Sequence, residues 1–168
     1  MTSEASRFSP PAWRVVAAFL IAPMVASLAT ACVEPEYLGL PSIWERMFQT
    51  ALMFSVLAAY PSTVVIGAPV FSLLRTKVAA LLANCALAGA CVAAAPWLAL
   101  DLSPTPNFSA SAGFRATVVD GHFTVWGWIE HGKFVLEIGG FGAFGGVVFW
   151  LVAVAGAVRR TQIAGIEG

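Results

Sequence analysis

The sequence predicts an all-α membrane protein, a four-helix transmembrane bundle with a small β-meander in one loop. Only 11% of the 168 residues are charged and 59% are hydrophobic, whereas about a quarter of the residues in a soluble domain are charged. Mean hydropathy is +0.82, so the chain cannot cover its surface with polar groups and needs lipid as its solvent. Four charge-free runs are each long enough to cross a bilayer core of about 30 Å at about 1.5 Å per residue.

The four runs form a single membrane domain over residues 1–168. Each run lacks any ionisable residue other than cysteine and tyrosine. The second run is longer than one crossing needs, so we expect it to tilt, kink or extend beyond the bilayer. The predicted spans are 15–33, 47–74, 78–100 and 138–158.

The first span has a second interpretation. Arg7 and Arg14, an apolar stretch and then the residues Ala29-Thr30-Ala31 resemble a cleavable signal peptide. The apolar run is long for a signal, so we expect a retained span. Cleavage, the alternative, would leave the remaining topology unchanged.

Two prolines interrupt the second span. Pro61 cannot donate a hydrogen bond to the carbonyl of Leu57, and Pro69 cannot donate one to that of Val65. Freed carbonyls inside a membrane can bind a cation or mark a hinge, although such kinks also occur in bundles without a transport role. The polar side chains beside the first proline are Ser62 and Thr63. Together these residues are a candidate hinge or polar site.

The third span contains Asn84, the clearest polar residue that the sequence places at membrane depth. Burying its amide without a partner would cost several kcal/mol, so we expect it to face another helix. An interhelical hydrogen bond is the favoured interpretation, and a substrate contact is the alternative. No predicted span contains a carboxylate, which weakens the hypothesis of proton-coupled transport.

The loop at 101–137 divides into two parts. Residues 101–113 resemble a linker, with two prolines and small polar side chains. Residues 114–137 predict three strands, FRATVV, HFTVWGWIE and KFVLE, joined at Asp-Gly and His-Gly turns. On the middle strand Trp126 and Trp128 would share one face, and that aromatic face is a possible partner surface.

The fourth span begins with a stripe of small residues. Gly142 and Gly146 form a GxxxG motif, which Gly139 and Ala153 extend. Small residues let helix backbones approach closely in a membrane. We favour packing against the chain's own helices, the third span above all. The alternative is an interface with a second copy or a partner.

Cations predict the orientation, because short cytoplasmic loops are rich in lysine and arginine. Six cations lie on the side of the termini and three on the other, which places both termini in the cytoplasm and the 101–137 loop outside. The six are Arg7, Arg14, Arg75, Lys77, Arg159 and Arg160, and the three are Arg46, Arg115 and Lys133.

Several function classes are disfavoured by the sequence. The formal net charge of zero argues against a nucleic-acid partner. His122 and His131, if both lie on one strand, are about 30 Å apart and cannot share a metal ion. The spacing of Ser, Asp and His defines no nucleophile elbow, and the spans contain no catalytic carboxylate pair. We therefore expect no enzyme activity, no metal and no cofactor.

Two segments, AAYPSTVVIGAPVFSLLRTK at 58–77 and GAFGGVVFWLVA at 142–153, resemble small four-span bacterial inner-membrane proteins. The resemblance rests on glycine, proline and tryptophan placement and implies a multi-pass protein of a bacterial inner membrane, with no activity attached. We expect a protein that acts by binding, as a homo-oligomer or an accessory subunit of another membrane protein in the lipid bilayer, with the outer loop as its contact or sensing surface. The alternative is a small transporter or channel-forming subunit that uses the broken second span.

Overall fold

The computed structural model describes residues 10–36, 39–75, 81–101 and 108–155. Within them four helices are long and apolar enough to cross a membrane, as the sequence predicts. Their bounds are Ala12–Val33, Ile43–Leu73, Leu82–Leu100 and Val125–Ala155. Residues 78–80 and 156–158 of the predicted third and fourth spans, and the cations Arg7, Lys77, Arg159 and Arg160, lie outside the described residues.

Helix α1 (Ala12–Val33) pairs with the second long helix, which runs from Ile43 to Leu74. The second long helix changes its winding along its length. Its segments in order are α2 (Ile43–Phe54), η1 (Ser55–Ala59, π-helical), α3 (Tyr60–Ser62), η2 (Thr63–Gly67, π-helical) and α4 (Ala68–Leu74). The Tyr60 hydroxyl donates a hydrogen bond of 2.7 Å to the Leu20 carbonyl of α1 and so joins the two helices near their middles.

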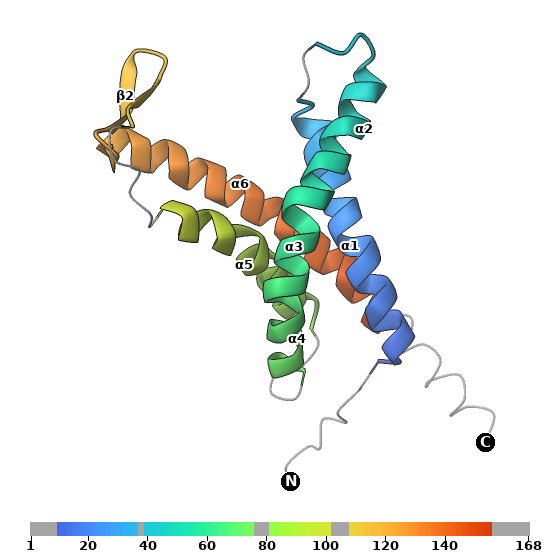
Figure 1. Ribbon diagram of the computed structural model, residues 1–168. Coiled ribbons are helices and arrows are strands. Elements are labelled where there is room, and N and C mark those ends of the chain that lie inside the picture. Colours follow the sequence, from blue (N-terminus) through green and yellow to red (C-terminus); the bar gives the residue numbers. More distant parts are fainter. Residues whose placement is uncertain (1–9, 37–38, 76–80, 102–107, 156–168) are drawn as a thin grey trace, which may run out of the picture.

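Helix α5 (Leu82–Asp101) pairs with α6 (Val125–Trp150), which continues as the π-helical segment η3 (Leu151–Ala155). Helix α6 crosses the α1 pair obliquely, so the two helix pairs diverge toward one end of the molecule (Figure 1). We call this the sheet end, because it carries the strands, and the opposite end the terminal end.

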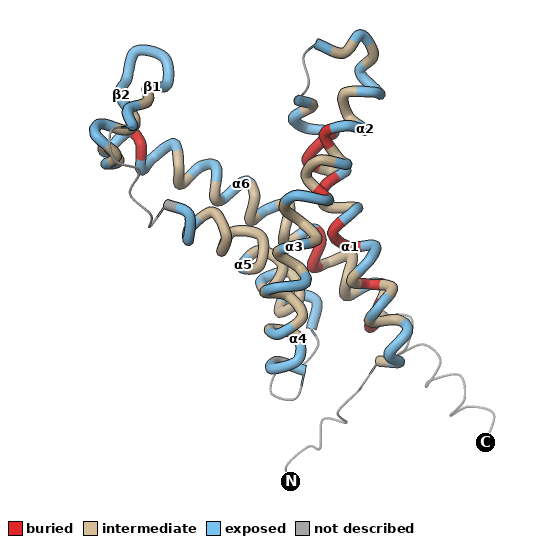
Figure 2. Tube along the Cα trace, in the orientation of Figure 1, coloured by how far each residue is buried: buried red, intermediate tan, exposed pale blue. Residues whose placement is uncertain are grey.

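Small residues form the core where α1 meets the fourth long helix. Ala18 and Ala153 are fully buried and Val154 is almost so. Close to them, three phenylalanines from three helices meet edge to face, with ring centroids 5.1–5.6 Å apart. These rings are Phe19 of α1, Phe71 of α4 and Phe149 of α6. Figure 2 shows buried residues gathered along α1 and its neighbours, whereas the sheet-end half of α6 is largely exposed or half-buried.

A three-stranded antiparallel sheet sits on the first turn of α6. Its strands are β1 (Ala110–Ala112), β2 (Arg115–Val119) and β3 (His122–Phe123), in that order across the sheet. Asp120 and Gly121 both have positive φ, 48° and 79°, as a two-residue type I′ hairpin turn requires. The Asp-Gly turn and a strand over most of FRATVV are thus where the sequence predicts them.

Thr124 joins the sheet to the helix. Its hydroxyl donates to the Ala116 carbonyl at 2.7 Å and accepts from the Gly127 amide at 3.1 Å, which caps α6. A side chain at Gly127 would collide with the Thr117 carbonyl and the Phe123 ring, so only glycine allows β2 to approach this turn.

The predicted second and third strands are largely wrong. Residues 125–137, including the expected His131-Gly132 turn, belong to α6, and the remaining strand β1 comes from the stretch expected to be a linker. An apolar run of this length fits a strand or a helix by pattern alone. Continuing the span as a helix satisfies its backbone hydrogen bonds within the segment, which favours helix next to a membrane.

Candidate functional site

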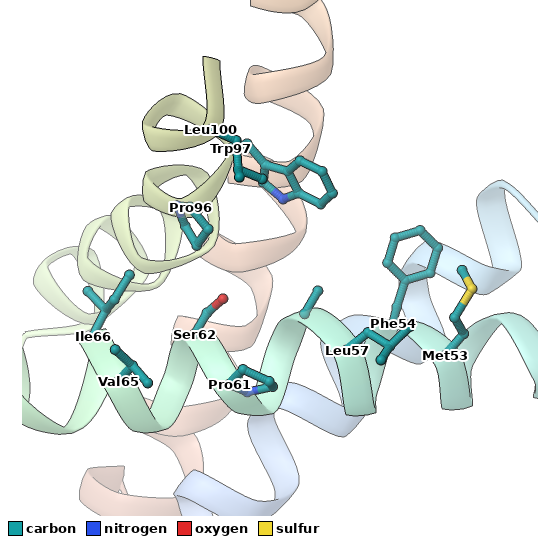
Figure 3. Close-up of a pocket in the computed structure, with 11 residues that line it drawn as sticks. Met53, Phe54, Leu57, Pro61, Ser62, Val65, Ile66, Pro96, Trp97 and Leu100 are labelled. Atoms are coloured by element: carbon teal, nitrogen blue, oxygen red, sulfur yellow. The ribbon is translucent and has the colours of Figure 1, made fainter. Parts of the chain in front are cut away.

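An apolar groove of about 480 Å³ lies between the second long helix and the sheet-end part of α5 (Figure 3). Eight of its eleven lining residues belong to the second long helix and three to α5. They are Met53, Phe54, Leu57, Ala58, Pro61, Ser62, Val65 and Ile66, together with Pro96, Trp97 and Leu100. The groove runs beside the point at which the two helix pairs diverge, and the described helices leave it open.

The lining residues of the second long helix are four adjacent pairs, spaced four positions apart, from Met53 and Phe54 to Val65 and Ile66. In a regular α-helix, residues four positions apart differ by about 40° in direction around the helix axis. Met53 and Val65, three such steps apart, would differ by about 120°. A π turn holds one more residue than an α turn, and the segments η1 and η2 therefore offset this difference. The eight residues can therefore line one groove together.

Each π turn ends two residues before a proline, at Ala59 before Pro61 and at Gly67 before Pro69. The Tyr60 amide bonds to the Ser55 carbonyl and the Ala68 amide to the Thr63 carbonyl, both five residues back. The segments SVLAAYPS (55–62) and TVVIGAPV (63–70) thus form an eight-residue repeat of sequence and of winding. The absence of a proline N–H disturbs the i→i−4 ladder at these points, and the extra residue of the π turn accommodates it.

The α5 side of the groove is held in place by α6. Trp97 meets Phe134 edge to face, with ring centroids 5.1 Å apart. Pro96 lies next to it and faces the groove across from Ser62 (Figure 3). Prolines from two facing helices, Pro61 and Pro96, therefore line the same groove.

The chemistry of the groove is that of an apolar binding surface. Among the lining residues, only the Ser62 hydroxyl and the Trp97 indole provide polar side-chain atoms, and none is acidic, basic or histidine. Such a lining can take up lipid chains or an apolar helix face, but it offers no general acid or base.

The other residues of the candidate hinge site are dispersed. Thr63 and Pro69 belong to the second long helix but do not line the groove. Asn84 is half-buried in the first turn of α5, about 18 Å along the helix axis from Pro96. The structure therefore brings Pro61 and Ser62 together with Pro96 and Trp97, and it does not bring Asn84 to this place.

The small-residue stripe of the fourth span lies against the chain's own helices. A Cβ atom added to Gly142 or Gly146 would collide with the backbone of α5, at Gly89 and Cys85 respectively. A Cβ atom added to Gly139 would lie 4.0 Å from the Ala90 carbonyl oxygen, and Ala153 packs in the cluster with Ala18 of α1. Gly145, outside the predicted stripe, approaches Ala26 of α1.

The predicted aromatic face of Trp126 and Trp128 does not exist. Both residues lie in α6, where two positions are about 200° apart around the axis. Trp126 stacks under the Arg115 guanidinium at 3.6 Å, whereas Trp128 contacts Phe123 and His131. The distance of 30 Å between the two histidines assumed that they share one strand, whereas His122 begins β3 and His131 lies in α6. Among the described residues no three His, Cys, Asp or Glu side chains form a metal-binding group.

Pro96 and Trp97 are not among the site residues predicted from the sequence. Their signal is a proline-tryptophan pair one helical turn before the acidic end of the third span. The eight-residue repeat that places Pro61 and Pro69 at equivalent positions is also visible in the sequence.

Comparisons with protein-family models, with curated proteins and with solved structures gave no match to this chain.

Proposed function

We propose that this protein is a non-enzymatic, multi-pass membrane protein that acts by binding, as a homo-oligomer or as an accessory subunit of another membrane protein. The groove between the second long helix and α5 carries the proposal. It is an apolar surface at membrane depth, shaped by two π turns and two prolines, that the chain's own helices leave open. A partner helix is the kind of surface that can cover it, because close helix packing is what holds membrane subunits together.

The distribution of burial supports a partner on this side. In the most apolar windows of α1 and the fourth long helix, 33% and 28% of the residues are buried. The corresponding shares are 6% for the second long helix and 0% for the third. The glycines of α6 already contact α5 and α1, so the GxxxG motif is occupied within the chain and the surface left for a partner is the groove side.

The sheet end provides a second contact surface, outside the bilayer. Phe114 occupies the tip of the β1–β2 turn and is fully exposed, next to Gly113 with φ +61°. Arg115 beside it is fixed over the Trp126 ring at 3.6 Å. An apolar tip with a fixed cation next to it can recognise a partner in the aqueous phase.

Native mass spectrometry of the gently solubilised complex tests this function. We expect a defined assembly larger than one chain, either copies of this chain or one stable partner. Leu57→Trp, which fills the groove, should dissociate it, whereas Leu87→Trp on an exposed part of α5 away from the groove should not. A monomer carrying only lipid, unchanged by either variant, would contradict the proposal.

A second candidate is a small transporter or channel-forming subunit, favoured by the two π turns in the second long helix, because such turns recur at functional sites. It predicts solute flux in liposomes containing the purified protein. Pro61→Ala should change the rate, whereas Pro69→Ala, outside the groove, should change it less. Absence of flux over a broad panel of ions and small solutes would count against this candidate.

We further propose a bacterial inner membrane, which the resemblance of residues 58–77 and 142–153 suggests, with both termini in the cytoplasm, which the distribution of lysine and arginine supports. In that orientation the sheet end lies on the outer face, where the predicted partner contact would take place.

A further inference from the structure

The fourth long helix is longer than a bilayer crossing requires. It has 31 residues, about 46 Å at 1.5 Å per residue, against a hydrocarbon core of about 30 Å. Residues 138–155 contain no charged side chain and account for about 27 Å. The thirteen residues from Val125 to Glu137 therefore lie at the edge of the core or outside it.

These thirteen residues present three sectors around the axis of α6. The first sector contacts other parts of the protein. Gly127 contacts β2, His131 lies 5.5 Å from the Phe123 ring, and Phe134 meets Trp97 of α5. At about 100° per residue these three positions fall within about 60° of one another.

The second sector is charged. It holds Glu130, Lys133 and Glu137, whose positions fall within about 60° of one another around the axis. All three are exposed, and the Lys133 ammonium pairs with the Glu130 carboxylate at 2.7 Å. Such a sector is stable when it faces water.

The third sector is apolar and exposed to a large extent in the described part of the chain. Val125 and Leu136 are 75% and 77% exposed, although they are large aliphatic side chains. Trp128 and Ile129, which lie between them in the sequence, are also exposed. The four positions fall within about 100° of one another, on the side of the helix away from both other sectors.

We infer that Val125–Glu137 is an interfacial membrane anchor, with its apolar sector sunk in lipid and its charged sector in water. The occupant of the apolar sector is the bilayer itself, because the same helix continues without a break into the charge-free segment at 138–155. An amphipathic segment with a tryptophan on its apolar side is the kind that lies in this interface.

The anchor would fix the height of the sheet above the membrane, since Thr124 and Gly127 join β2 to the first turn of α6. This inference goes beyond the proposed function. It concerns a different face of the molecule from the groove, and it holds or fails whether or not the groove binds a partner.

Spin labels on adjacent residues test the anchor at matched depth. Two pairs are suitable, Ile129→Cys with Glu130→Cys and Leu136→Cys with Glu137→Cys, each made in the full chain with its three native cysteines replaced and reconstituted into phosphatidylglycerol–phosphatidylcholine vesicles. We expect the ratio of collision with oxygen to collision with a water-soluble nickel chelate to be several-fold higher at 129 and 136 than at 130 and 137. Leu87→Cys, exposed in the middle of the third span, is the lipid reference.

Two results would overturn the inference. Equal ratios within both pairs would place the segment in water. Low collision with both reagents at 129 and 136 would mean that protein, a partner or a second copy, covers the apolar sector. Hydroxyl-radical oxidation of the unmodified chain in the same vesicles gives an independent check, because Trp126 should be oxidised and Trp128 protected, and the reverse or equal oxidation contradicts the anchor.

Discussion

At the scale of single residues, glycine determines how closely the helices approach. Gly89 of α5 meets Gly142 and Gly146 of α6 so closely that a Cβ atom on any of the three would lie within 2.5 Å of a neighbouring atom. In lipid, the stabilising free energy of such contacts comes from dispersion attraction and not from the release of water. These three glycines are therefore the positions at which the α5–α6 pair is least tolerant of change.

Gly146→Ala should destabilise the protein by about 1–3 kcal/mol, the usual cost of adding a methyl group to a filled space. The added Cβ would collide with the Cys85 carbonyl. Thermal unfolding in detergent measures the effect. Gly140→Ala is the matched control, since nothing lies within 4 Å of its Cβ position and alanine is the better helix former. Equal losses for both variants would contradict the packing described here.

The sequence shows that Gly142 and Gly146 can bring helices together, but it does not show which helix they meet. The choice depends on the rotation of α6 about its axis, which the sheet, α1 and α5 set jointly. Gly145 is an example, because it lies outside the GxxxG motif and yet touches α1.

At the scale of elements, the second long helix is the most unusual part of the molecule. Its charge-free length and its prolines predict a kinked span. The response of the backbone is less predictable, because a missing proline N–H can produce a bend, a bound water or a π turn. The pairing of this helix with α1 depends on few polar contacts, of which the Tyr60 hydroxyl to Leu20 carbonyl bond is the one near the helix middles.

Tyr60→Phe should lower the free energy of unfolding by about 0.6 kcal/mol, typical of interhelical hydrogen bonds in membranes. The phenyl ring is kept, so the change isolates the 2.7 Å bond to α1. Thermal unfolding of purified protein, compared with Ser62→Ala in the groove, provides the measurement. A Tyr60→Phe protein as stable as the wild type would mean that this bond contributes nothing to the pairing.

The sheet and α6 contain one feature that the sequence predicts, the turn at 120–121, and one that it does not, the boundary between sheet and helix. The Asp120-Gly121 turn was predictable because its type demands positive φ at both residues. The boundary at Thr124 was not, because Val125–Glu137 alternates well enough for a strand, and a helical cap of one threonine is a weak signal beside that pattern.

At the scale of the whole molecule, four charge-free runs suffice to predict four long helices. The divergence of the two helix pairs follows instead from contacts spread over many residues, so no local pattern in the sequence predicts it. The groove results from that divergence, which is why Pro96 and Trp97 were not expected to face Pro61.

The orientation proposed for the molecule is directly testable. A green fluorescent protein fused to the C-terminus should fluoresce in intact bacterial cells, because both termini are proposed to be cytoplasmic. A cysteine at Asp120, in the exposed turn of the sheet, should react with a membrane-impermeant maleimide added outside. A dark fusion together with an unreactive Asp120→Cys protein would reverse the orientation.

The most direct test of binding through the groove is photo-crosslinking in the native membrane. A benzoylphenylalanine at Leu57, 72% exposed and lining the groove, is compared with one at Leu87, 66% exposed and outside it. We expect position 57 to form a protein adduct of one defined mass, a dimer of this chain or a single partner, and position 87 to form none. Lipid adducts alone at both positions, or the same protein adducts at both, would contradict a partner seated in the groove.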